Sequence, residues 1–419
     1  MSTRNLILLI IVLVILLAGA FGFFYLYRPA TQTPAGESPN FVATLWPFGQ
    51  SGTTTPGDTT PPADISGYTP PSPQNTVTAK LHRVSSMPIA GYGVFMKQRY
   101  GETIAETVPY IRYADRAMGN TYQTFADKIE ERKFSVTNVP KLYEAYFGNG
   151  GESVTMRYLK EDSKTIETFA GVLPKEILGG DTGVENQLAG SFLPENISDV
   201  SISPDFSKIF YLLPSGDGTV GITAFASGEG KNQVFSSPFT EWLSQWPNQR
   251  MITLTTKPSG VALGYMYAVD PNQKDFNKIL GGINGLTTLA SPSGKLVLYA
   301  DNNLSLKIFN IGTGETVRAG VKTLPEKCVW GSGSDTVYCA VPKYISSVIY
   351  PDSWYQGETS FSDEIWKIDV LNGNGVLLAD PTTIENAYNI DGINLKLSEE
   401  EKYLFLVNKN DSYLWELEL

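Results

Sequence analysis

The chain has 419 residues, of which 42% are hydrophobic and 12% aromatic, so it has ample material for a large core. Its net charge of −11 argues against a nucleic-acid partner, because phosphate repels an acidic protein that lacks a concentrated basic stripe. A single histidine, His82, excludes most histidine-based catalytic triads and histidine-rich metal sites.

The N-terminus contains an uncharged run of 22 residues, Leu6 to Tyr27. At about 1.5 Å per residue, a helix of this length crosses the hydrocarbon core of a bilayer. A cleaved signal peptide is the alternative, since Ala18 to Ala20 resembles a cleavage site. The apolar run continues beyond the usual length of a signal-peptide core, so we expect an uncleaved transmembrane helix at residues 6–27.

The segment after this run determines the expected orientation. No Lys or Arg occurs between Arg28 and Lys80, and a segment without positive charge crosses a membrane readily. We therefore expect residues 1–5 in the cytoplasm and the rest of the chain outside it. Residues 28–75 are rich in Pro, Thr, Ser and Gly, a composition that cannot bury enough apolar surface to fold, and we expect a flexible stalk there.

From residue 80 onward, short apolar runs alternate with turn residues, which predicts an all-β domain. One pattern recurs, in which small and polar turn residues precede an apolar and aromatic strand. The copies are "ISPDFSKIFYLL" (Ile202 to Leu213), "ASPSGKLVLYA" (Ala290 to Ala300), "WGSGSDTVYCA" (Trp330 to Ala340) and "LSEEEKYLFLV" (Leu397 to Val407). A repeat of roughly 40 residues with four strands per copy is typical of a β-propeller blade.

With these repeats the chain resembles the WD40-like propellers of the TolB type, whose repeat reads approximately Ser-Pro-Asp-Gly-Lys before a strand. The resemblance spans roughly residues 80 to 419. Only the copies at Ser203 and Ser291 keep Ser-Pro, and the Gly-His and Trp-Asp pairs of strict WD40 repeats are absent. The resemblance implies a fold and does not imply an activity.

We expect seven blades, with six or eight as alternatives, at residues 88–138, 139–198, 199–247, 248–286, 287–326, 327–390 and 391–419. The last stretch supplies three strands, so a closed ring needs one more from elsewhere. The segment "TVTAKLHRVS" (Thr76 to Ser85) has the alternation of a strand and is expected to complete the last blade. The predicted propeller domain therefore covers residues 76–419.

The only two cysteines, Cys328 and Cys339, flank a Gly/Ser-rich turn. Pairing Trp330 with Val337 and Val329 with Tyr338 places the two cysteines directly opposite each other, within disulfide reach. A metal site would need further ligands, and a redox motif usually has two residues between its cysteines. We predict a disulfide, which forms in an oxidising compartment and supports the placement of the domain outside the cytoplasm.

No motif in the chain names a reaction. A P-loop, a nucleophile elbow and an EF-hand loop are all absent from the sequence. The stretch "SGDGTVGI" (Ser215 to Ile222) approaches the sialidase-type box, but Thr219 and Ile222 stand where Gly and Trp are expected. We therefore predict no catalytic residue, no cofactor and no metal, and interpret the chain as a protein without enzymatic activity.

Two aromatic segments are candidate binding surfaces. The loop from Lys343 to Ser362 is expected between the second and third strands of the sixth blade and carries Tyr344, Tyr350, Trp354, Tyr355 and Phe361. In the segment from Ser237 to Arg250, Trp242 and Trp246 are four residues apart, as on one face of a short helix. Loops longer than about 12–15 residues are often functional, and Tyr and Trp concentrate in binding hot spots. Local packing of these aromatics onto the propeller is the alternative.

These features predict a single-pass membrane-anchored extracytoplasmic propeller that binds another protein of the cell envelope as a scaffold or adaptor. The alternative is a propeller of the cell envelope that binds a glycan or cleaves one. Two suitably placed carboxylates suffice for glycoside cleavage, and the chain has 43 acidic residues.

Overall fold

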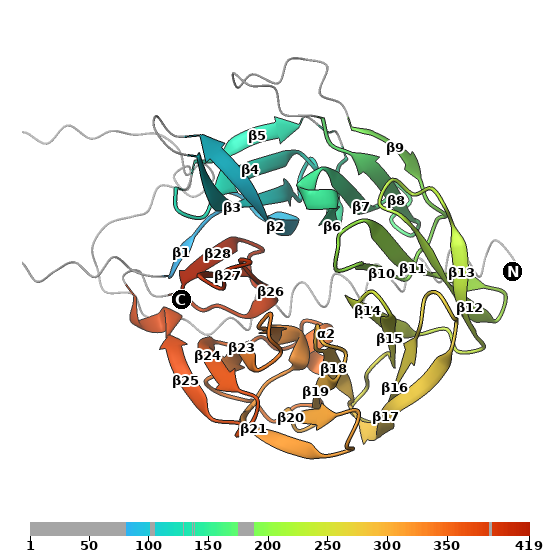
Figure 1. Cartoon of the computed structure of the whole chain (residues 1–419), viewed down its shortest axis with the longest axis vertical. Helices are drawn as coiled ribbons and strands as arrows, with labels where there is room; N and C mark the ends of the chain where they lie inside the picture. Colours follow the sequence, from blue (N-terminus) through green and yellow to red (C-terminus); the bar gives the residue numbers. More distant parts are fainter. Residues whose placement is uncertain are drawn as a thin grey trace, which may run out of the picture. The chain divides into compact units, whose positions relative to one another are not determined.

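The computed structural model describes residues 81–100, 105–128, 130–135, 137, 139–174, 188–384 and 388–419. Within these ranges, seven four-stranded antiparallel sheets form a ring, which confirms the predicted seven-bladed propeller (Figure 1). The predicted transmembrane helix at residues 6–27 and stalk at residues 28–75 lie outside the described residues. Among the residues that are described, no helix has the length and apolar character needed to cross a membrane.

The first six blades each consist of four consecutive strands, paired in chain order. Blades 1 to 3 contain β2 (Ile89–Tyr100), β3 (Ala105–Asp115), β4 (Thr121–Phe125) and β5 (Arg132–Ser135); β6 (Leu142–Gly148), β7 (Ser153–Leu159), β8 (Ile166–Val172) and β9 (Ala189–Phe192); and β10 (Asp199–Ile202), β11 (Lys208–Ser215), β12 (Gly218–Phe225) and β13 (Asn232–Ser237). Blades 4 to 6 contain β14 (Trp242–Asn248), β15 (Met251–Thr256), β16 (Leu263–Val269) and β17 (Phe276–Asn284); β18 (Thr287–Ala290), β19 (Leu296–Ala300), β20 (Ser305–Asn310) and β21 (Thr316–Lys322); and β22 (Cys328–Trp330), β23 (Thr336–Pro342), β24 (Asp363–Asp369) and β25 (Gly375–Ala379).

Strands from the two ends of the domain close the ring. Blade 7 contains β26 (Gly392–Leu397), β27 (Tyr403–Asn408) and β28 (Leu414–Glu418), and its fourth strand is β1 (Leu81–Arg83). In this antiparallel pair Leu81 is opposite Leu417, and Arg83 is opposite Trp415. The strand expected within residues 76–85 is found here, and it covers the edge that β28 would otherwise expose.

The repeated sequence pattern corresponds to a repeated turn between the first and second strands of a blade. In the copies that begin with serine, the hydroxyl oxygen accepts a hydrogen bond from the backbone N–H five residues later, as from Lys208 to Ser203 and from Tyr403 to Ser398. The fourth residue of the turn is left-handed in each copy, at Phe206 (φ 58°), Gly294 (φ 68°), Ser334 (φ 60°) and Glu401 (φ 53°). Only one copy has Gly at this left-handed position, so the sequence pattern is hard to recognise in the other copies, although their turns have the same backbone conformation.

One predicted boundary and one predicted helix are wrong. The third blade ends with β13 at Ser237, and residues 242–248 form β14, the first strand of blade 4. Trp242 and Trp246 therefore lie on a strand and not on a helix. Residues four apart share one face of a strand as well as one face of a helix, so their spacing could not distinguish the two.

Strand ends define two faces of the ring. Connections between second and third strands, and between consecutive blades, emerge on one face, here called the loop face. Hairpins between first and second and between third and fourth strands emerge on the opposite hairpin face. The β27–β28 connection lies on the loop face, so β28 ends on the hairpin face. Leu81 pairs with Leu417 near that end. The first described residue and the C-terminus therefore both lie on the hairpin face.

Candidate functional site

The insertion at residues 343–362 joins β23 to β24, the second and third strands of blade 6, as predicted. It contains the short helix α2 (Asp352–Tyr355) and covers the loop face across several blades. The Lys409 ammonium of blade 7 donates to the Trp354 carbonyl (2.7 Å), and the Gly260 amide of blade 4 donates to the Asp352 carboxylate (2.6 Å). The helix at the middle of the insertion is therefore held to blades 4 and 7, and the insertion does not project freely.

Three of its predicted surface aromatics form the core of this cover. Tyr350, Trp354 and Phe361 are buried and pack against two leucines of blade 5. Leu304 lies in the connection from β19 to β20, and Leu324 follows β21. Their rings stack, with centroids 5.7 Å apart for Tyr350 and Phe361 and 6.3 Å apart for Trp354 and Phe361. They cannot serve as contact residues on the outer surface, because they supply the apolar burial that holds the insertion down.

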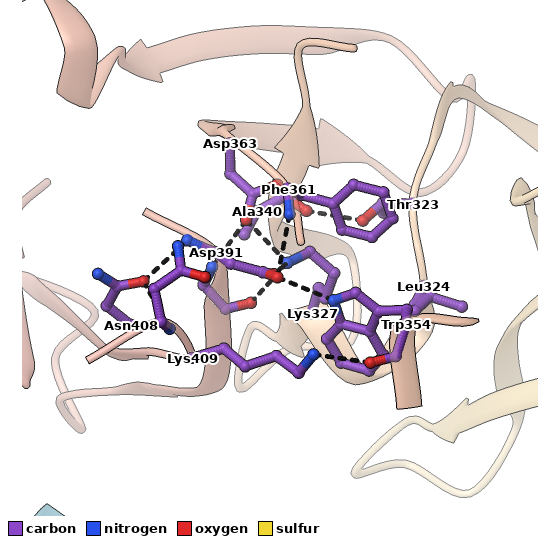
Figure 2. A network of polar contacts seen from close by, with 12 residues as sticks. Thr323, Leu324, Lys327, Ala340, Trp354, Phe361, Asp363, Asp391, Asn408 and Lys409 are labelled. Carbon is purple, nitrogen blue, oxygen red and sulfur yellow. Dashed lines mark hydrogen bonds and ion pairs between the residues drawn. The ribbon is translucent and has the colours of Figure 1, made fainter. Parts of the chain in front are cut away.

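Beneath these rings lies a fully buried polar network (Figure 2). Lys327, at the end of the short helix η3 (Pro325–Lys327), has its ammonium 2.8 Å from an Asp363 carboxylate oxygen and also pairs with Asp391. The second oxygen of Asp391 accepts hydrogen bonds from the Trp354 indole (2.9 Å) and the Phe361 amide (3.1 Å). One lysine thus joins the base of blade 6, the end of the insertion and the connection to blade 7.

Burial also changes the ionisation of two carboxyl groups at this site. Desolvation raises the pKa of Asp363 to about 6, although the Lys327 charge opposes the shift. Desolvation likewise raises the pKa of Glu326 to about 7, against the hydrogen bond that the Tyr355 hydroxyl donates to it. Sequence reasoning missed Lys327, Asp363, Asp391 and Glu326, because charged residues scattered between positions 326 and 391 show no local pattern.

The outer surface of the insertion exposes several large apolar side chains. Tyr344 is 79% exposed, Ile349 is 55% exposed, and Val348 and Tyr355 are also exposed. Val261, 78% exposed, follows Gly260 on the neighbouring β15–β16 connection, which contacts the insertion. We call these five residues the outer patch. Tyr344 and Tyr355 are thus the two predicted surface residues that remain available to a partner.

Gly260 is required for this arrangement. A Cβ atom there would lie 2.4 Å from the Tyr350 carbonyl oxygen and 2.8 Å from the Ile349 side chain. The backbone of the blade 4 connection can approach the insertion only because residue 260 has no side chain. The outer patch is therefore built on two connections that are packed backbone to backbone.

The second predicted surface, at Trp242 and Trp246, is also buried. Both side chains belong to a core cluster with Phe210, Phe235 and Leu254. Trp246 in addition lines a cavity of about 230 Å³ between blades 3 and 4. The other walls include the cations Lys208 and Arg250 and the amides Asn232, Gln249 and Asn272, and no carboxylate of the described part of the chain lines it.

Carboxylates do meet on the innermost strands. Glu144 on β6 pairs with Arg157 and accepts a hydrogen bond from the Tyr146 hydroxyl (3.1 Å). Asp199 on β10 accepts hydrogen bonds from the Ser244 amide (2.6 Å) and hydroxyl (2.7 Å). Desolvation raises the pKa of Asp199 to about 6, and the charge of Glu144 adds to this shift. Both carboxylates are engaged by neighbouring donors, which is the arrangement of a structural network between blades 2, 3 and 4.

The predicted disulfide is confirmed. Cys328 on β22 is directly opposite Cys339 on β23, and the two sulfur atoms are bonded. The bond lies in the core cluster between blades 5 and 6, immediately after Lys327. Among the described residues, no group of three or more His, Cys, Asp or Glu side chains is placed to hold a metal ion.

Comparison with known proteins adds to the fold description. No protein-family model matches the sequence, and no curated protein matches it. Solved structures with a similar fold include an oligogalacturonate lyase in complex with manganese (8% identity, 80% of this chain and 98% of that one, TM-score 0.47). Others are an oligogalacturonate lyase from Vibrio parahaemolyticus (7%, 80% and 98%, 0.46) and a putative 6-phosphogluconolactonase from Bacteroides fragilis (12%, 78% and 90%, 0.44). At these identities the similarity concerns the fold alone.

Proposed function

We propose that this propeller is a non-catalytic binding protein, held at a cell membrane by residues 6–27 and recognising another protein of the cell envelope through the outer patch. The observation that carries the proposal is the outer patch itself. Tyr344, Ile349 and Val261 expose large apolar side chains on a backbone that is fixed by buried contacts. A rigid surface loses little conformational entropy on binding, and exposed apolar clusters commonly mark protein interfaces.

The polarity of the domain supports the same proposal. The described chain begins at Leu81 on the hairpin face, whereas the outer patch lies on the loop face. The point at which the preceding chain joins the propeller is therefore on the face opposite the outer patch. The disulfide suits the extracytoplasmic location that the sequence predicts. We also propose that the repeats are related to those of the TolB-type propellers.

Substitution of the outer patch tests this function. We expect the double variant Tyr344→Ala, Ile349→Asp to bind its envelope partner at least about 30-fold more weakly, since hot-spot side chains each contribute roughly 2 kcal/mol or more. The measurement is recovery of the partner with the full chain from detergent-solubilised membranes, followed by titration of the purified pair. Deletion of residues 343–362 would not be informative, because it would also remove Trp354 and Phe361 from the core.

The matched control is Leu371→Asp. Leu371 is 86% exposed on the β24–β25 hairpin of the same blade, and therefore lies on the opposite face. It should bind the partner as the unmodified chain does. Equal recovery with the outer-patch variant and with the control would refute the assignment of the outer patch.

A second candidate function rests on the cavity between blades 3 and 4. Its lining of Lys208, Arg250, three side-chain amides and Trp246 offers hydrogen-bond donors, positive charge and an aromatic ring. The Arg250 guanidinium also lies 3.7 Å from the Asp270 carboxylate, so an anionic ligand would share this cation with Asp270. This composition fits a small anionic ligand such as an acidic sugar residue. It does not fit glycoside cleavage by two carboxylates at the same place, so the candidate function there is binding only.

A glycan screen separates the two functions. If the cavity binds an acidic sugar, we expect the full chain to bind oligosaccharides that carry carboxylate groups. The variant Arg250→Ala should bind the same oligosaccharides at least about tenfold more weakly. Lys274→Ala, which changes an exposed lysine on the neighbouring β16–β17 turn, is the control. Retention of neutral and acidic sugars alike, or retention that is unchanged in Arg250→Ala, would remove this candidate.

A further inference from the structure

The lysine beneath the insertion is held between two carboxyl groups with no access to water. Lys327, Asp363 and Asp391 all have side chains that are 0% exposed. The Lys327 ammonium contacts one oxygen of each carboxyl group, and its third hydrogen-bond partner is the Gly392 carbonyl (3.1 Å). These three side chains come from three different segments of the chain, as Figure 2 shows.

We propose that Lys327 and Asp391 condense to an intramolecular amide crosslink, with Asp363 carrying the proton that must move between them. The Lys327 nitrogen adds to the Asp391 side-chain carbon, and the bond from that carbon to the oxygen facing Lys327 breaks. The ammonium and carboxylate together become one amide and one water. Two of the three ammonium protons leave with that oxygen, so the step needs no oxidant, reductant or external reagent.

The surroundings of Asp391 suit it as the group that is attacked. The oxygen that would remain in the amide accepts hydrogen bonds from the Trp354 indole (2.9 Å) and the Phe361 amide (3.1 Å). Negative charge builds on this oxygen when nitrogen adds to the carbon, and two fixed N–H donors stabilise that charge. The other oxygen faces Lys327 and is therefore placed to leave.

The surroundings of Asp363 suit it as the proton carrier. One of its oxygens lies 2.8 Å from the Lys327 nitrogen and accepts a hydrogen bond from the Gly392 amide (2.7 Å). Its other oxygen is buried and has no hydrogen-bond partner among the residues that the structure describes. Burial raises the pKa of Asp363 to about 6, so the group can take up and release a proton near neutral pH.

Burial and alignment favour the reaction over the ordinary ion pair. Holding the two reacting groups in contact replaces a collision between separate molecules, which is a large part of the barrier in water. The rings of Trp354 and Phe361 lie 5.4 Å and 5.2 Å from the Lys327 nitrogen and cover the site. Exclusion of water also disfavours the reverse hydrolysis.

The crosslink would join two inter-blade connections. Lys327 directly precedes blade 6 and the disulfide at Cys328, and Asp391 directly precedes blade 7, which contains both the first and the last described strand. Blade 7 would then be attached covalently to the base of blade 6. A pulling force applied through residues before Leu81 acts on blade 7, so this is the blade that such a bond would secure.

Mass measurement of the full chain tests the proposal without any variant. After reduction of the disulfide and denaturation, we expect a mass lower by one water than the sequence mass. Proteolysis should yield one branched peptide that joins the segments containing Lys327 and Asp391. A folded, disulfide-bonded preparation whose denatured mass equals the sequence mass would overturn the proposal, and so would a branch from Lys327 to Asp363.

Three variants test the chemistry. Lys327→Met has no amine and should keep its full sequence mass. Asp391→Asn should reach the same final mass as the unmodified chain, because it loses ammonia where the aspartate loses water and forms the same amide. Asp363→Asn should form the disulfide but remain without the crosslink. A crosslinked Asp363→Asn protein would overturn the role given to Asp363.

Discussion

Replacement of Asp391 by alanine is expected to lower the free energy of unfolding by roughly 3–5 kcal/mol, which is the usual cost of removing one partner from a buried ion pair. The carboxylate serves Lys327, Trp354 and Phe361 together, and all of these donors are buried. Alanine would leave the indole and the amide without an acceptor as well. The expectation holds whether Lys327 and Asp391 form an ion pair or an amide bond, because alanine can form neither with Lys327.

Denaturant unfolding of the full chain, monitored by tryptophan fluorescence, measures this effect. Trp354 reports on the insertion directly, since its indole donates to Asp391. Glu399→Ala, an exposed acidic residue in the first turn of blade 7, is the matched control and should shift the midpoint little. A midpoint for Asp391→Ala within the range of that control would show that the network is not a major contributor to stability.

The same network explains what sequence reasoning could and could not reach. The disulfide pairing followed from a count of residues around one turn, and the register of β22 with β23 is the predicted one. The seven blades followed from a local turn pattern that recurs in blades 3, 5, 6 and 7, together with the regular spacing of the other strands. Both features depend on residues that are close in the sequence, where spacing alone determines which side chains meet.

The candidate site depends on residues that are distant in the sequence. Lys327 and Asp391 meet only because the ring brings consecutive inter-blade connections together on the loop face. The aromatic insertion was recognised from its composition, but composition does not distinguish Tyr344, which is exposed, from Trp354, which is buried. That distinction is made by Leu304 and Leu324, which cover one side of the insertion, and by Lys409, which lies over the Trp354 ring.

Replacement of Glu416 by glutamine is expected to stabilise the propeller at alkaline pH, by roughly 2–4 kcal/mol at pH 9. Glu416 on β28 is 1% exposed, and within the described ranges neither of its oxygens has a hydrogen-bond partner. The His82 imidazole lies 3.6 Å from one Glu416 oxygen, and burial lowers the pKa of that histidine. Burial raises the pKa of Glu416 to about 8, and the charges of Asp127 and Glu418 add to this shift.

The direction of the pH dependence follows from this raised pKa. Between the ordinary glutamate pKa of about 4.3 and the folded value of about 8, the folded state binds more protons than the unfolded state. The stability of the unmodified chain therefore falls as the pH rises through this window, and the glutamine variant lacks this loss. Unfolding midpoints of the two proteins, measured at intervals from pH 5 to pH 9, should diverge up to about pH 8 and then level off. Glu400→Gln, an exposed neighbour of the same blade, should follow the unmodified chain throughout. Parallel curves for Glu416→Gln and the unmodified chain would mean that Glu416 ionises in the folded protein as it does in water.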